Sequence, residues 1–238
     1  MHHVVVDRWS RADTFLHRRD PRAKVIATLV FLVVLATTPG NAFVALAVDF
    51  VLLTIALAIA RLPIANVLLR ASAVLPFCLT FALISWIVGD RERALALIEK
   101  TYLSAIAVLL LAATTPLPAL IRGLDTLGAP RFLLTVVQFM YRYLFVISEQ
   151  AQHMRIAAAS RAGIAFKQRF SFGAAAGAVA VLFARSYHRS EGIHRAMAAR
   201  GFKERFPVAQ SLKFQTIDAA FTLVSVALVI LTRLEWRP

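Results

Sequence analysis

Long apolar runs alternate with short polar segments along this chain. Four runs carry few or no charges and approach the roughly 20 residues that a helix needs to cross about 30 Å of hydrocarbon: residues 41–60, 71–89, 101–121 and 214–232. A shorter run, residues 25–38, ends at Pro39-Gly40-Asn41, which predicts a tight turn into the next run. We therefore expect five membrane-spanning helices, of which the first is the shortest.

Composition agrees with a membrane protein. Hydrophobic residues make up 59% of the 238 and charged residues only 17%, which is too apolar for a water-soluble domain of this length. The first two dozen residues are polar and lead to no cleavage site, so we expect no secretory signal. The single cysteine, Cys78, lies in an apolar run, which excludes an internal disulfide and favours a small apolar core residue.

The net charge of +14 is unevenly distributed. Lys and Arg number six before the first apolar run and fourteen within residues 116–213, against two between the second and third runs. The positive-inside rule therefore places the N-terminus and residues 116–213 in the cytoplasm. Anionic lipid head groups account for the basic residues there, so nucleic acid is not needed as a partner.

These patterns predict an all-α polytopic membrane protein with a cytoplasmic helical insert. Its three parts are residues 1–115 (the N-terminal segment and four spans), residues 116–213 (the insert) and residues 214–238 (the last span). Gly128-Ala129-Pro130 breaks the insert, and residues 131–160 then lack Gly and Pro, which predicts one long helix. We interpret residues 132–148 as amphipathic because Arg142 interrupts them; a sixth span is the alternative.

Two helix ends in the insert share an unusual pattern of small residues, one arginine and a glycine. The first comprises Ala159, Ser160, Arg161 and Gly163, with Ala162 between the arginine and the glycine; the second comprises Ala199, Arg200 and Gly201. Small residues permit close approach, and a guanidinium forks onto carboxylates or carbonyls. Each end is therefore suited to a narrow groove on another protein, although one copy alone is also compatible with an ordinary helix terminus.

Together with Asp20-Pro21-Arg22-Ala23-Lys24, the two signatures resemble the transmembrane T component of energy-coupling factor (ECF) importers, an ABC-type family. The strings YRYLFVISEQAQHMRIAAASRAG (141–163) and SYHRSEGIHRAMAARGF (186–202) are most similar to its cobalt branch, CbiQ. Arg200 with its neighbours matches the second coupling motif of that family directly. Arg161 matches the first with the inserted Ala162 as a departure.

The resemblance implies a non-catalytic subunit without cofactors in the bacterial inner membrane. Its two coupling helices dock on two cytoplasmic ATPases, while its membrane helices hold a separate substrate-binding component. Cobalt is the expected cargo, and nickel or a vitamin such as biotin would use a similar scaffold. A stand-alone secondary carrier is the other alternative, although the polar residues concentrate in the insert instead of in repeated spans.

Other chemistries have weaker signals. Gly123 and Gly128 have the spacing of a phosphate loop, but no lysine follows. His2 and His3, or Glu191 with His194, would give incomplete metal sites, so we expect none.

The remaining polar residues near the spans have structural roles in this interpretation. We expect Asp20 to cap a helix that Pro21 begins, and Arg22 and Lys24 to anchor it at the membrane interface. Asp49 lies within a span and should face the bundle interior and a polar partner.

Overall fold

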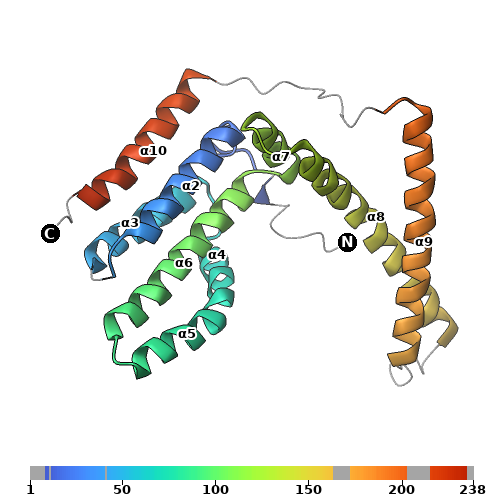
Figure 1. Cartoon of the computed structure of the whole chain (residues 1–238), viewed down its shortest axis with the longest axis horizontal. Helices are drawn as coiled ribbons and strands as arrows, with labels where there is room; N and C mark the ends of the chain where they lie inside the picture. Colours follow the sequence, from blue (N-terminus) through green and yellow to red (C-terminus); the bar gives the residue numbers. More distant parts are fainter. Residues whose placement is uncertain (1–8, 11, 41, 163–171, 203–214, 235–238) are drawn as a thin grey trace. The chain divides into compact units, whose positions relative to one another are not determined.

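The computed structural model describes residues 9–10, 12–40, 42–162, 172–202 and 215–234, and this part of the chain contains helices and no strand (Figure 1). The all-α class is confirmed. Contacts divide the chain into two compact units: unit 1 comprises residues 1–128 and 210–238, and unit 2 comprises residues 129–209.

Unit 1 contains a short 3-10 turn and seven helices with described bounds. In chain order they are α2 (Pro21–Thr37), α3 (Phe43–Ile59), α4 (Ile64–Ala71), the turn Ser72–Val74, α5 (Leu75–Ile87), α6 (Arg91–Thr114), α7 (Leu117–Thr126) and α10 (Thr216–Leu234). Unit 2 contains α8 (Arg131–Ala162) and α9 (Phe172–Ala199), which pack against each other.

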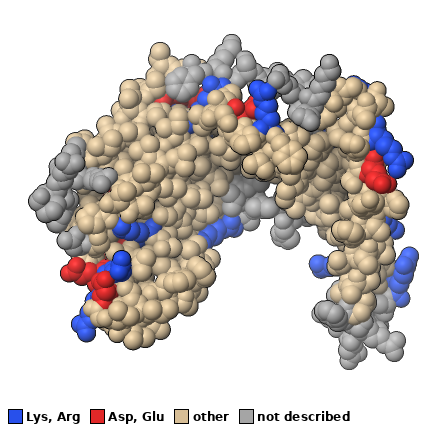
Figure 2. Space-filling model, viewed as in Figure 1, with Lys and Arg blue, Asp and Glu red and all other residues tan. Residues whose placement is uncertain are grey.

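The outer surfaces of these helices are suited to lipid. Segments Ile64–Ile87, Arg91–Thr114 and Arg131–Arg161 are long and apolar enough to cross a membrane, and Phe43–Ile59 and Thr216–Thr232 are shorter apolar helices. Large apolar side chains such as Phe77 (72% exposed) and Ile87 (75% exposed) point outward. Figure 2 shows the charged side chains of unit 1 in separate clusters, with broad uncharged areas between them. Such a surface would be unstable in water, so the protein is a polytopic membrane protein.

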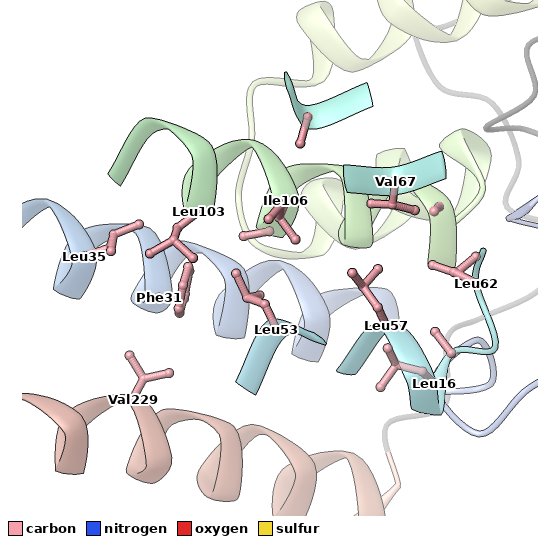
Figure 3. Close-up of a cluster of buried hydrophobic side chains, with 14 of the residues drawn as sticks. Leu16, Phe31, Leu35, Leu53, Leu57, Leu62, Val67, Leu103, Ile106 and Val229 are labelled. Atoms are coloured by element: carbon pink, nitrogen blue, oxygen red, sulfur yellow. The ribbon is translucent and has the colours of Figure 1, made fainter. Parts of the chain in front are cut away.

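The core of unit 1 lies between α2, α3, α4, α6 and α10. Helix α2 packs against α6, α7 and α10, while α6 also contacts α3, α4 and α5. Figure 3 shows the side chains that fill the space between them, among them Phe31, Leu57 and Ile106. Leu57 and Ile106 are at most 1% exposed. The close fit holds the ends of α2, α6 and α10 in fixed positions.

Several helix bounds differ from those that the apolar runs predict. The run 101–121 predicts one span, but α6 begins earlier, at Arg91, and ends at Thr114, because prolines follow at 116 and 118 and residue 117 starts α7. The run 71–89 predicts one helix, but a 3-10 turn separates α4 from α5. Helix α9 begins at Phe172 and so includes Gly173 and Gly177, although glycine is a weak helix former.

Two expectations for the insert are confirmed. Helix α8 is continuous from Arg131 to Ala162, as the absence of Gly and Pro predicts. The break at residues 128–130 separates α7 from α8, and Gly128 has a φ of +90°. The length and composition of α8 are compatible with a sixth span as well as with an amphipathic helix.

Candidate functional site

The C-terminal end of α9 has a complete Schellman motif. The Phe202 N–H donates to the Met197 carbonyl at 3.1 Å, and the Gly201 N–H donates to the Ala198 carbonyl at 3.0 Å. Gly201 has a φ of +68°, the left-handed conformation that this motif requires and that glycine adopts without strain. Arg200 is therefore the C-cap residue, and its backbone is held by hydrogen bonds on both sides.

This geometry presents the second arginine signature at the surface. Ala199, Arg200 and Gly201 are all exposed. The preceding residue, Ala198, is also small and exposed, so little side-chain volume surrounds the guanidinium. A partner groove can approach the backbone closely here and receive a bidentate cation.

The first signature lies in a different local structure. Arg161 is exposed and occupies the last turn of α8, inside the helix instead of after it. Ser160 is exposed and donates its hydroxyl to the Ile156 carbonyl at 3.0 Å, whereas Ala159 is half-buried. Gly163 lies outside the described residues. The two signatures therefore offer similar chemistry from two different backbone positions.

The length of α9 separates the signatures along the chain. Arg161 precedes α9 and Arg200 follows it, and the 28 residues of α9 rise by about 42 Å. An ion pair between Arg195 Nη2 and Glu191 Oε2, at 3.2 Å, stabilises the intervening helix at i,i+4 spacing. The two signatures are therefore separated along the chain by the whole of α9.

The N-terminal ends of α2 and α10 lie side by side. Asp20 caps α2 by accepting from the Arg22 N–H at 2.8 Å, and Pro21 occupies the first turn, as predicted. Asp218 caps α10 by accepting from the Gln215 N–H at 3.1 Å, and its other oxygen accepts from the Asp20 N–H at 3.2 Å. One carboxylate thus joins the N-terminal ends of α2 and α10.

Lys24 connects the same region to the end of α6. The interface-anchor role predicted for Lys24 is wrong, because its side chain is only 5% exposed. Its Nζ donates to the Thr114 carbonyl at 2.9 Å, to Thr115 Oγ1 at 3.2 Å and to the His17 carbonyl at 3.3 Å. The last carbonyls of α6 lack helical partners, so a buried cation satisfies them.

The described contacts therefore put the end of α6 at the face where α2 and α10 begin. Thr115, which follows α6, and Gln215, which precedes α10, therefore lie at that face, and the residues between them contain both arginine signatures. This polar junction, formed by Lys24, Asp20 and Asp218 with the ends of α2, α6 and α10, was not predicted from the sequence. A lysine one residue before an apolar run was the available signal, but the carbonyl that it meets is 90 positions away.

The structure also bears on the metal-site candidates. Residues 2 and 3 lie outside the described part of the chain, and Glu191 pairs with Arg195. Among the described residues there is no group of three or more His, Cys, Asp or Glu that could hold a metal ion. Asp49 is 2% exposed and faces the bundle interior, where the Thr232 hydroxyl lies 3.4 Å from its carboxylate.

A family model and a relative of known name point to the same family. Residues 12–211 match the family model of CbiQ, described as a cobalt transport protein. A cobalt transport protein CbiQ of Rhodobacter capsulatus is 31% identical over 111 residues, 47% of this chain and 45% of that protein. An uncharacterized protein of Methanocaldococcus jannaschii is 30% identical over 149 residues, 60% of this chain and 54% of that protein.

The chain thus spans about half the length of the curated relatives it matches. The family model, in contrast, covers Asp20 and Lys24, the helices α2 to α9 and both arginine signatures. The resemblance that these signatures indicate is confirmed by the match. With its apolar helices and this match over most of its residues, the chain belongs to the CbiQ family of cobalt transport proteins.

Proposed function

We propose that this chain is the membrane scaffold and coupling subunit of an ECF-type ABC importer. Its partners are two cytoplasmic ABC ATPases and a separate membrane protein that binds the substrate. The observation that carries this proposal is the exposed Arg200 on a Schellman-capped, small-residue helix end. The ATPase-coupling residues are Ala159, Ser160, Arg161, Gly163, Ala199, Arg200 and Gly201.

The mechanism is mechanical and requires no chemistry in this chain. ATP binding draws the two ATPases together, and each moves the helix end that it holds. Helix α9 is continuous over 28 residues and α8 over 32, so a displacement at one end is carried to the other. Unit 1 then reorients the substrate-binding subunit, which releases its cargo.

The proposed topology places the N-terminal segment and residues 116–213 in the cytoplasm of a bacterial cell, with residues 1–115 and 214–238 providing the inner-membrane bundle. Two contacts support this topology. Lys24 binds the end of α6, and Asp218 of α10 binds Asp20, so both ends of the insert lie at the same face as the N-terminal segment. Cobalt is the proposed cargo, because the Rhodobacter capsulatus relative is named a cobalt transport protein.

The decisive experiment removes the two signature arginines. Arg200→Ala and Arg161→Ala, singly and together, should reduce the ATPases that co-purify with the tagged chain and reduce ATP-dependent cobalt uptake. Truncating one partner of a buried, hydrogen-bonded charge pair costs about 2–5 kcal/mol. Arg195→Ala is the matched control, because Arg195 is exposed on α9 but pairs with Glu191 within its own helix.

Unchanged ATPase recovery and unchanged uptake in the double variant would contradict the proposal. Uptake of nickel or a vitamin in place of cobalt would change the cargo and leave the coupling role intact. Cobalt uptake by the chain without any ATPase would favour a stand-alone carrier.

The orientation has a separate test. In a Cys78→Ala background, a cysteine at position 160 or 198 should react with a membrane-impermeant maleimide only from the cytoplasmic side. Labelling of residue 160 from outside would indicate that α8 is a sixth span and would place Arg161 out of reach of the ATPases.

A further inference from the structure

Unit 1 contains an apolar groove between α2, α3, α6 and α10. It has a volume of about 360 Å³, within the range of roughly 300–1,000 Å³ that is typical of small-molecule sites. Its walls are residues 52–59 of α3, 107–114 of α6 and 221–229 of α10, together with the first half of α2. Apolar surface dominates these walls, so the groove is suited to a hydrocarbon chain.

The groove covers only one half of the bundle. On α2, α3 and α6 its residues lie toward the face where α2 begins and where α3 and α6 end, and on α10 they lie in the middle of the helix. Its wall on α10 runs from Phe221 to Val229, which is about 12 Å along a helix. One leaflet contributes half of the roughly 30 Å hydrocarbon thickness, so the groove matches the acyl region of a single leaflet.

A second, polar pocket of about 290 Å³ lies at the same face. Lys24 lines both cavities, and the Arg19 guanidinium, which lines the polar pocket, stacks 4.4 Å from the ring centroid of Phe15, which lines the groove. The apolar and polar sites therefore adjoin each other. Amphiphilic ligands need this arrangement.

Arg19 has unused hydrogen-bonding capacity in the polar pocket. Its Nη1 is buried and forms no hydrogen bond within the described part of the chain, although it forms an ion pair with Asp218 Oδ1 at 3.6 Å. Arg18, by contrast, is bound to Asp13 through two contacts of 2.7 Å. Those hydrogen bonds and the charge of Arg18 hold the pKa of Asp13 below its ordinary value, so this pair stays ionised.

We propose that a phospholipid with an anionic head group binds unit 1, with one acyl chain in the groove and its phosphate near Arg19. Basic pockets between transmembrane helices on the cytoplasmic side are known to select anionic lipids. The site requires only that unit 1 spans the bilayer, so it is independent of ATPase coupling. Its role is to seal α10 against α2 and α3.

Native mass spectrometry of the full-length chain in detergent tests this inference. Titration with dioleoylphosphatidylglycerol should give one tightly bound lipid, and dioleoylphosphatidylcholine should bind about tenfold more weakly because its head group has no net charge. Ala56→Phe fills the groove and should weaken the binding of both lipids by about tenfold or more. Ala58→Phe is the matched control, since Ala58 is exposed on α3 outside the groove.

Substitutions of Arg19 test the proposed contact with the lipid head group. Arg19→Gln should abolish the preference for the anionic lipid and Arg19→Lys should restore it in part, whereas Arg93→Gln, at the exposed start of α6, should have no effect. Inorganic phosphate in excess should not displace the lipid; displacement would assign the pocket to a soluble anion and overturn the inference. Equal lipid binding by the wild type and Ala56→Phe would also overturn it, even if Arg19→Gln fails to fold.

Discussion

Replacing Gly201 with alanine changes only the backbone preference at the end of α9. A Cβ built at this glycine meets no atom within 4 Å, so the substitution introduces no clash. The φ of +68° must nevertheless be kept, and the left-handed conformation costs an L-residue about 1–2 kcal/mol. The Schellman hydrogen bonds from the Gly201 and Phe202 amides should therefore open about five- to thirtyfold more often.

Gly192 provides a control with the opposite sign. It also has open space at its Cβ position, but it lies in the interior of α9. Alanine there should stabilise the helix by about 0.8–1 kcal/mol, because glycine is the weaker helix former. The same chemical change thus has opposite effects at two positions of one helix.

Hydrogen–deuterium exchange of the full-length chain in detergent measures both effects. A peptide covering residues 196–202 should exchange faster in Gly201→Ala, and a peptide around Gly192 should exchange more slowly in Gly192→Ala. Gly201→Asn should lie between the wild type and alanine, since asparagine tolerates the left-handed conformation. The amount of ATPase that co-purifies with the chain should fall in Gly201→Ala and stay unchanged in Gly192→Ala. Equal exchange in all variants would refute the claim that the Schellman motif holds Arg200.

Three further experiments test the packing of unit 1 by thermal unfolding in detergent. Lys24→Met leaves the last carbonyls of α6 without their buried donor and should lower the free energy of unfolding by about 1–3 kcal/mol; an unchanged midpoint would contradict this. A double-mutant cycle of Asp49→Ala and Thr232→Val should give a coupling of about 0.6 kcal/mol between α3 and α10, and zero coupling would dismiss the contact. Gly123→Leu should destabilise by about 1–3 kcal/mol, because a Cβ at Gly123 already lies 3.2 Å from that of Pro21; wild-type stability would argue against close packing of α7 on α2.

Helix ends marked by special backbone chemistry could be predicted from the sequence. The Asp20 cap, the break at residues 128–130 and the stop at Gly201 all depend on local preferences that one residue type satisfies better than others. The exposed Arg200 follows from the same reasoning, since a small-residue helix end leaves a long side chain uncovered.

Helix bounds read from hydropathy were less accurate because hydropathy reports contact with lipid, while a helix continues wherever its backbone hydrogen bonds continue. Helix α6 extends through charged residues to Arg91, where Asp90 accepts from the Arg93 N–H at 3.1 Å and caps it. That capping signal was present in the sequence. The burial of Lys24 was not predictable in this way, because its partners are distant in sequence and only packing brings them near.

The contact between Asp20 and Asp218 joins residues 198 positions apart, which has a consequence for biogenesis. Helix α2 emerges from the ribosome long before α10, against which it packs. At about 5–20 residues per second, α2 waits roughly ten to forty seconds for that partner. During this interval its α10-facing side is open to lipid or to a membrane insertase, so the bundle closes only after α10 has been synthesised.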